Sequence, residues 1–526
     1  MKSNEWLGAD IDRRAALQVL IASAAVPLLP SLGLAEGAHG TDGETMLYGS
    51  LDDMASALRR GDLTAVELLE RQLDRIDRLD GALHSYLTVM RESAMADARR
   101  ADTEFRAGRV RSALQGIPVS VKDLCNTKGV RTTAGLAQRA NYVPTTDATV
   151  VARLRRAGAV IVGKANLCEG AMSAYSRNYP IPVNPWVADR WPGGSSSGSG
   201  VAVAAGLCFG SIGTDTGGSI RWPSCQNGIV GLKPTFGQVS RYSVFGLSHS
   251  LDHVGPMARR VVDVAHLFDA IAGPDALDAS TKNARSSASA AALRGATSLK
   301  GVRVGVDDAY ALSGIEPAQI VAVQRVIDVL RDLGATIVPV RLPSMDAVAA
   351  QLYPTIQYEV LQEHARLYPS TREQYGEFFR EFLDASKQIA PAVYAKAQQD
   401  RAAFSAAFRD ELRRVDTVLA PGGRVGGRIG PETFYGGFST LGELTTTYSN
   451  SFSPPLRPID PLAAPMNLAG TPSVCLPAGF DDAGLPTGVQ FAGERYTEAM
   501  QLRIAHACEQ AMPWRDRHPN LLSAPS

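Results

Sequence analysis

This chain of 526 residues has no formal net charge, because 53 lysines and arginines are balanced by 53 aspartates and glutamates. Proteins that bind nucleic acid normally carry a basic excess, so the balance argues against a nucleic acid as partner. Cysteine is also scarce, since the six residues are scattered and form no C-x-x-C pair. This spacing argues against a metal cluster and a disulfide scaffold, and we expect neither a metal nor another cofactor.

Apolar stretches that could cross a bilayer are lacking everywhere except near the N-terminus. There, Arg13 and Arg14 precede an apolar stretch, Ala15–Leu34, that ends in small residues. This is the layout of an export signal, and the arginine pair resembles a twin-arginine leader. An uncleaved membrane anchor is the alternative, but two prolines in the second half of the stretch favour cleavage. We expect residues 1–35 to be a signal peptide, and the mature protein to be periplasmic or secreted without membrane insertion after processing.

The rest of the chain, residues 36–526, contains no internal repeat and no second linker, so one large domain is the simplest arrangement. A helix is expected from Thr64, which can form a capping box with Glu67, to a stop at Gly81. A second helix leads through a glycine turn into a β-branched strand at Val160–Val162. Further strands are expected at GVRVGV, DTVLAPG, SVCLP and TGVQFAG. Alternating helices and buried strands indicate an α/β fold.

The stretch GGSSSGSG, at Gly193–Gly200, has the composition of a flexible linker. It is followed at once by a small-residue helix and then by a second glycine-rich turn, which carries Ser219. We interpret these two loops, separated by one close-packed helix, as backbone shaped around a ligand. Glycines let main-chain N–H groups approach a substrate atom, and such groups can form an oxyanion hole.

A serine nucleophile needs a base, and the sequence offers two candidates. The first is a histidine, because Gly194–Gly198 matches the G-x-S-x-G nucleophile elbow. That motif requires a preceding strand, whereas the preceding segment holds two prolines, and no downstream histidine lies in a suggestive setting. The second is Lys122, which ends the apolar run in GIPVSVKD; burial would favour its neutral form. Lys122 could equally do no more than pair with Asp123 at a strand end.

Four motifs, GIPVSVKD, GGSSSGSG, GTDTGGSIRWP and GLKPTFGQVSR, resemble the amidase signature family and stand in its order. The resemblance extends over roughly Leu51–Trp514. It implies a single large α/β domain whose mixed β-sheet core is surrounded by helices. It also implies a Ser–Ser–Lys triad with no histidine and no metal. In that triad Ser219 is the nucleophile, Ser195 bridges to the lysine through a cis peptide bond, and Lys122 is the base.

Residues around the triad take supporting roles under the same resemblance. The turn that carries the nucleophile is expected to bind the oxyanion through the backbone amides of Thr216, Gly217, Gly218 and Ser219. Asp215 and Arg221 flank the nucleophile, and we expect them to pair and hold the loop rather than to form an ordinary surface ion pair. Ser196 is expected to support hydrogen bonding. Met172 matches a position that often faces the acyl pocket, and it could equally fill the core.

The implied activity is hydrolysis of linear amides, at C–N bonds other than peptide bonds, through an acyl-enzyme on Ser219. Esterase activity can accompany it, because esters are chemically easier to cleave. The expected partner is a small-molecule amide, and a homodimer is left open. The first alternative is the A subunit of a glutamyl-tRNA amidotransferase, against which the export signal argues. The second is a non-catalytic exported binding protein of the same fold, against which the complete triad argues.

The substrate is the least specified part of this interpretation. The resemblance places pocket walls around Leu352–Tyr394 and Thr433–Pro461. Aromatic side chains in these segments could line an apolar pocket or belong to the core: Tyr353, Tyr358, Tyr435, Phe438 and Tyr448.

Overall fold

The computed structural model describes residues 43–344, 348–423, 435, 460–514 and 516–521. Residues Gly43–Ser526 form one compact unit. The signal peptide expected at residues 1–35 lies outside the described residues and stays a prediction. No helix in the described ranges is both long and apolar enough to cross a membrane.

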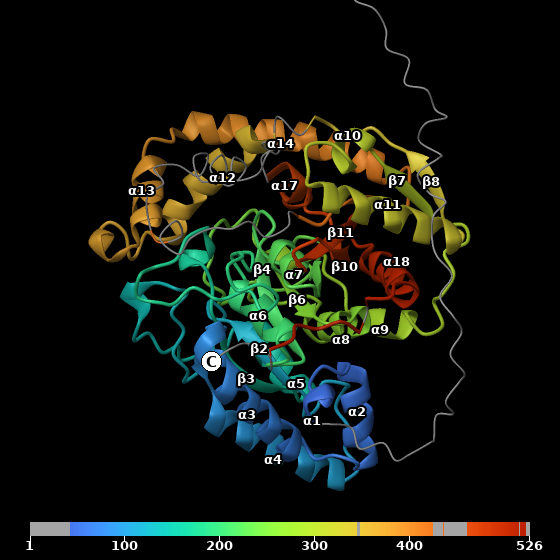
Figure 1. Ribbon diagram of the computed structural model, residues 1–526. Helices are drawn as coiled ribbons and strands as arrows, with labels where there is room; N and C mark the ends of the chain where they lie inside the picture. The colour runs from blue at the N-terminus through green and yellow to red at the C-terminus, as the bar shows by residue number, and fades with distance from the viewer. Residues whose placement is uncertain (1–42, 345–347, 424–434, 436–459, 515, 522–526) are drawn as a thin grey trace, which may run out of the picture. The chain divides into compact units, whose positions relative to one another are not determined.

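A mixed β-sheet forms the core, and the described residues contribute 11 strands to it in the order β1-β3-β2-β4-β6-β5-β10-β11-β9-β7-β8 (Figure 1). The strands are β1 Tyr86–Val89, β2 Pro118–Lys122, β3 Val160–Ala165, β4 Gly210–Asp215, β5 Val230–Lys233, β6 His253–Ala258, β7 Arg303–Val306, β8 Thr336–Pro339, β9 Thr417–Pro421, β10 Ser473–Phe480 and β11 Pro486–Ala492. β2 runs parallel to both β3 and β4, whereas β4 pairs antiparallel with β6. The expected α/β fold with a mixed sheet is confirmed.

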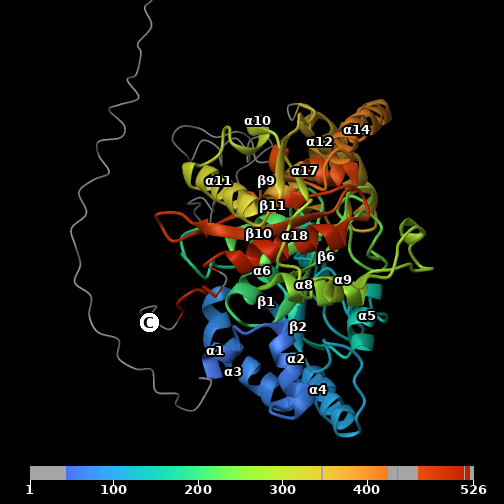
Figure 2. The ribbon, with the colours of Figure 1, turned by 90° about the vertical axis from the view of Figure 1, so that its right-hand side faces the viewer.

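Helices surround the sheet, as Figures 1 and 2 show. They are α1 Gly43–Met46, α2 Leu51–Arg60, α3 Ala65–Leu83, α4 Arg91–Arg106, α5 Thr149–Ala157, α6 Ser197–Ala204, α7 Arg221–Gln226, α8 Val261–Ile271, α9 Ser289–Ala292, α10 Asp308–Ala311, α11 Pro317–Asp332, α12 Val348–Glu363, α13 Glu377–Ser386, α14 Pro391–Leu412, α17 Asp460–Ala469 and α18 Glu498–Ala511. Two glycines of β4 show how closely helices approach both faces of the sheet. A Cβ at Gly210 would lie 2.5 Å from Leu267 of α8, and one at Gly213 would lie 2.9 Å from Ser196 beside α6.

Helix α3 begins where the sequence predicts, but it ends later than predicted. Thr64 and Glu67 form both hydrogen bonds of the capping box. The predicted stop at Gly81 is wrong, because the helix continues to Leu83 and His84 takes the left-handed conformation at its end. The carboxylate of Asp80 accepts bonds from the backbone N–H groups of Ser85 and Tyr86, which fixes the exit of the chain beyond the glycine.

The glycine–serine run is ordered structure in its second half. Helix α6 begins at Ser197 and is buried along its whole length. The prediction of one helix between the two glycine-rich turns missed β4, which connects α6 to the turn of Ser219. Every residue of β4, with the sequence GSIGTD, is buried. A strand covered on both faces needs no alternation of polar and apolar residues, so the usual strand signal is missing.

Candidate active site

Lys122 is the last residue of β2, and its side chain is fully buried. Its Nζ donates hydrogen bonds to Ser195 Oγ at 2.8 Å and to Thr214 Oγ1 at 2.9 Å. Burial lowers the pKa of Lys122 from 10.5 to about 8. A lysine held this way is partly neutral at pH 7 and mostly neutral above pH 8, so its amine is suited to accept a proton from a serine hydroxyl.

Asp123 does not pair with Lys122, so the interpretation of Lys122 as half of a strand-end ion pair is wrong. The Asp123 carboxylate lies 3.5 Å from the Nζ of Lys164 on β3. It also accepts bonds from the backbone N–H and the hydroxyl of Thr133. Side chains alternate between the two faces of a strand, so consecutive residues at the end of β2 point to different surroundings. Among the described residues, the Nζ of Lys122 is therefore hydrogen-bonded to hydroxyl groups alone.

Ser195 and Ser196 connect the start of α6 to β4. The peptide bond between Gly194 and Ser195 is cis, as the resemblance implies. The Ser196 hydroxyl donates to the carbonyl of Thr214 at 3.2 Å and accepts from the N–H of Thr214 at 3.3 Å. The N–H of Ser196 donates to the carbonyl of Ser219 at 3.3 Å. Ser196 therefore ties together the two segments that carry the serines of the predicted triad.

Ser219 lies half-buried in the turn between β4 and α7. The structure brings its backbone next to the Ser195 segment, and the hydrogen bonds of the described residues include none between the hydroxyls of Ser195 and Ser219. The N–H of Gly218, one of the amides expected to bind the oxyanion, donates to the Asp215 carboxylate at 2.8 Å. For the amides of Thr216, Gly217 and Ser219, the described part of the chain contains no such partner.

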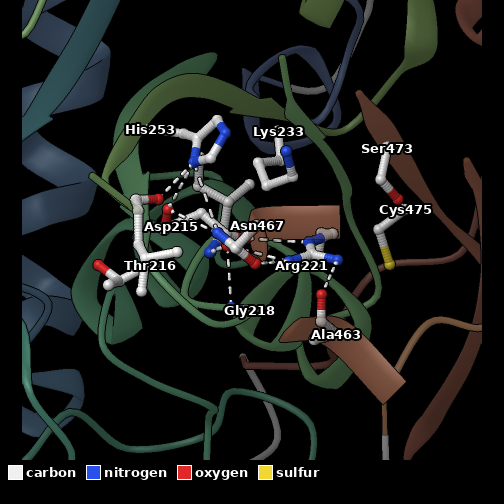
Figure 3. A network of polar contacts seen from close by, with 12 residues as sticks. Asp215, Thr216, Gly218, Arg221, Lys233, His253, Ala463, Asn467, Ser473 and Cys475 are labelled. Atoms are coloured by element: carbon white, nitrogen blue, oxygen red, sulfur yellow. Dashed lines mark hydrogen bonds and ion pairs between the residues drawn. The ribbon is translucent and has the colours of Figure 1, made fainter. Parts of the chain in front are cut away.

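Asp215 and Arg221 form a buried ion pair that holds this turn, as Figure 3 shows. The guanidinium donates two bonds of 3.0 Å, one to each carboxylate oxygen of Asp215. Both side chains are fully buried, so this is not a surface ion pair. Burial by itself would raise the pKa of Asp215, but the charge and hydrogen bonds of Arg221, together with the charge of Lys233 and the hydrogen bond from Asn467, hold the pKa well below its usual range.

The same network reaches the C-terminal part of the chain. Arg221 also donates to the carbonyl of Ala463 at 2.9 Å and to the side chains of Asn467 at 2.7 Å and Gln490 at 3.1 Å. Asn467 in turn donates to the Asp215 carboxylate at 2.8 Å. Sequence reasoning assigned no role to Asn467 or Gln490. The only available signal was the resemblance of NLAGTPSVCLPAGF to the family, which gives no function to a single side chain.

The histidine alternative finds no support in the geometry. His253 of β6 contacts the carbonyl of Asp215, and burial lowers its pKa well below the usual value. Within the described residues no histidine is hydrogen-bonded to Ser195 or Ser219. The same ranges contain no group of three or more histidine, cysteine or carboxylate side chains that could hold a metal ion.

Of the residues proposed to line the substrate pocket, the described part of the chain places one in the core and three in partly buried positions. Met172 is 6 % exposed and belongs to the main hydrophobic cluster, together with the partly buried Tyr353. Tyr358 stacks on Tyr394 with ring centroids 4.2 Å apart. Tyr435 packs in a small aromatic cluster with Tyr175, Trp191 and Trp222, and its hydroxyl donates to the Tyr179 carbonyl. Phe438 and Tyr448 lie outside the described residues.

The site thus consists of a buried lysine beside two serine-containing loops, on a mixed sheet with helices on both faces. The amidase family model matches residues 67–502, and the chain belongs to the amidase family. Membership of this family makes the protein a hydrolase of amide C–N bonds.

Relatives with different roles share this similarity. The candidate amidase AmiD of Mycobacterium tuberculosis is 40% identical over 469 residues, which cover 89% of this chain and 95% of that protein. The glutamyl-tRNA(Gln) amidotransferase A subunit of Chloroflexus aggregans is 38% identical over 495 residues, covering 91% and 99%. Among solved structures, the peptide amidase of Stenotrophomonas maltophilia is 31% identical with a TM-score of 0.77, covering 90% of this chain and 99% of that one.

Proposed function

We propose that the protein hydrolyses a linear carboxylic amide through an acyl-enzyme on Ser219, with Ser195 as proton relay and Lys122 as base. The observation that carries this proposal is the hydrogen bond between Lys122 and Ser195 in a buried setting that lowers the pKa of the lysine to about 8. A neutral amine accepts a proton from a hydroxyl, whereas an ammonium does not. The site therefore supplies the base that a serine nucleophile requires.

In the acylation step, Ser219 Oγ attacks the carbonyl carbon while its proton passes to Ser195 and the proton of Ser195 passes to Lys122. The negative charge that develops on the carbonyl oxygen is stabilised by the amides of Thr216, Gly217 and Ser219, because Gly218 is engaged by Asp215. The C–N bond then breaks as the relay returns a proton to the nitrogen. Water attacks the ester in the second half-reaction through the same relay, which releases the carboxylate and frees Ser219.

Covalent trapping tests this proposal. A fluorophosphonate should label Ser219, and hydroxylamine added during turnover should yield the hydroxamate of the acyl group. Ser219→Ala should lose both signals together with hydrolysis. Ser370→Ala is the matched control, because Ser370 is an exposed serine between α12 and α13. Turnover near that of the unaltered enzyme in Ser219→Ala would contradict the assignment.

The similarity to the amidotransferase A subunit supports a second candidate function, release of ammonia from an amide for a partner subunit. The two functions differ in what the isolated chain does. An amidase turns over a simple amide alone, whereas an amidotransferase subunit depends on its partners for its overall reaction. Hydrolysis of a simple amide by the purified mature chain, without added subunits or tRNA, therefore favours the first function.

A further inference from the structure

A cavity of about 230 Å³ lies beside the relay, and its lining combines catalytic-loop residues with charged side chains. Thr214 and Thr216, which line it, belong to β4 and to the turn of Ser219. The remaining lining includes apolar surface from Phe245 and charged surface from Asp252 and Glu363. All these residues lie in the described ranges, and the mechanism above gives the cavity no role.

The position of the cavity identifies the half of the substrate that it faces. Thr214, which lines the cavity, accepts a hydrogen bond from Lys122 Nζ through its Oγ1, so only this side chain separates the cavity from the proposed base. In amide hydrolysis the leaving nitrogen takes its proton from this relay, so the amine half must lie on the lysine side of the scissile bond. The carbonyl oxygen instead faces the amides of the turn at residues 216–219.

Negative charge dominates the lining of the cavity. Three carboxylates, Asp252, Asp278 and Glu363, face one guanidinium, that of Arg241. Arg241 lies 4.0 Å from Asp278, and its backbone N–H donates to the same carboxylate, so these two charges largely offset each other. Among the described residues, Asp252 forms no ion pair with a lysine or an arginine, and neither does Glu363. The imidazole of His249 lies 3.7 Å from Glu363 and is charged only when it is protonated.

Two further observations concern these carboxylates and the helix end beside them. Burial raises the pKa of Glu363, and the negative charge of Asp252 raises it further, while the charges of His249 and Arg241 act in the opposite direction. Burial raises the pKa of Asp252 as well, although Thr216 Oγ1 donates to it at 2.6 Å. Glu363 is also the last residue of α12, and the last turn of that helix contains no basic residue. The carbonyl groups at a helix C-terminus carry partial negative charge and add to the field.

We propose that this cavity binds the amine half of the substrate, that it selects amides whose amine half carries an ammonium group, and that Glu363 determines this charge selectivity. The proposal rests on the amidase function proposed above. An ammonium at the end of a short alkyl chain places its charge near Glu363 and Asp252 while the chain packs on the apolar lining around Phe245. Such a substrate is a monoacyl derivative of a diamine, and its products are a carboxylate and a free diamine.

The experiment compares three amides of benzoic acid whose amine halves have similar size. They are the 2-aminoethyl amide, which is cationic, the 2-hydroxyethyl amide, which is neutral, and the carboxymethyl amide, which is anionic. For each, kcat/KM is measured by chromatography of the products. Each amide is also tested for protection of Ser219 against a fluorophosphonate, which reports binding even where turnover is slow. The expected order is cationic, then neutral, then anionic.

Variants of Glu363 test the assignment of the charge. Glu363→Gln should lower kcat/KM for the cationic amide about tenfold, the size expected from one half-exposed ion pair, and change the neutral amide less than twofold. Glu363→Lys should reverse the order between the cationic and anionic amides. Glu70→Gln is the matched control, because Glu70 is an exposed residue of α3 and is absent from the cavity lining.

The outcomes separate this inference from the proposed function. If Ser219 is not labelled and no amide is cleaved, the proposed function fails. If Ser219 is labelled but the three amides protect it equally and are cleaved at equal rates, only the inference about the cavity is overturned. If a Glu363 variant does not fold, the order of kcat/KM for the three amides in the unaltered enzyme still tests the inference about the cavity. An unchanged preference in a folded Glu363→Gln would also overturn it.

Discussion

The proton affinity of Lys122 gives the sharpest prediction for the reaction. Because burial lowers the pKa of this lysine from 10.5 to about 8, about a tenth of the free enzyme holds a neutral amine at pH 7 and about nine tenths at pH 9. We expect kcat/KM for a neutral amide to rise about tenfold between these two pH values and then to level. An unperturbed lysine would instead produce a rise that continues beyond pH 10.

The same shift has a consequence for stability, whose sign follows from proton binding. Between pH 8 and 10.5 the unfolded chain binds more protons at this site than the folded chain, so the free energy of unfolding rises with pH across that interval. The difference of 2.5 pH units corresponds to about 3 kcal/mol that the buried lysine costs below pH 8. The bonds to Ser195 and Thr214 offset about 1 kcal/mol each.

Two substitutions at this position separate base catalysis from other roles. Lys122→Met should abolish turnover. It should also raise the free energy of unfolding at pH 7 by about 1 kcal/mol, because it removes a burial cost of about 3 kcal/mol and two hydrogen bonds of about 1 kcal/mol each. Lys122→Arg should also be inactive, because a guanidinium stays charged and cannot accept a proton. The assays are pH-dependent initial rates and urea unfolding. An active Lys122→Arg enzyme, or a rate constant that does not change between pH 6 and 9, would refute the reasoning.

Three further results are expected. Arg221→Met leaves the Asp215 carboxylate buried without its cation and should lower the free energy of unfolding by about 3–5 kcal/mol in urea titrations; a double variant with Asp215→Asn should lose less than the sum of the two single losses. Activity should survive EDTA and dialysis, because the described residues offer no cluster of metal ligands, and a loss that zinc restores would contradict this. N-terminal sequencing of the protein from its native host should find a start near Glu36 outside the cytoplasm, whereas an intact Met1 in the cytoplasmic fraction would contradict export.

The features that could be predicted from the sequence are those determined by neighbours along the chain. The capping box of Thr64 and Glu67 involves residues three positions apart, and it forms as expected. The burial of Lys122 follows from the apolar run that precedes it. The pairing of Asp215 with Arg221 spans a single turn of backbone and is confirmed.

The features that escaped prediction depend on contacts between distant segments. Asn467 lies 252 positions from Asp215, and Lys164 lies on β3, whereas Asp123 directly follows β2. Neither contact leaves a local pattern in the sequence. Gly218 illustrates a second reason, because a backbone N–H can serve the oxyanion or the Asp215 carboxylate, and only the geometry of the turn decides between them. The cavity lining joins β4, the loop after β5 and the end of α12, which sequence spacing does not relate.

The hydrogen bonds from Arg221 to Ala463, Asn467 and Gln490 have a consequence for biosynthesis. These partners follow Arg221 by 242, 246 and 269 positions. A ribosome that adds about 5–20 residues per second needs roughly 10–50 s to cover such a distance. Throughout that interval the nascent chain already contains Lys122, Ser195 and Ser219, but it lacks the groups that fix the nucleophile turn. The turn of Ser219 therefore gains its final hydrogen bonds only when translation is almost complete, and truncated products that end before α17 should carry Lys122, Ser195 and Ser219 without activity.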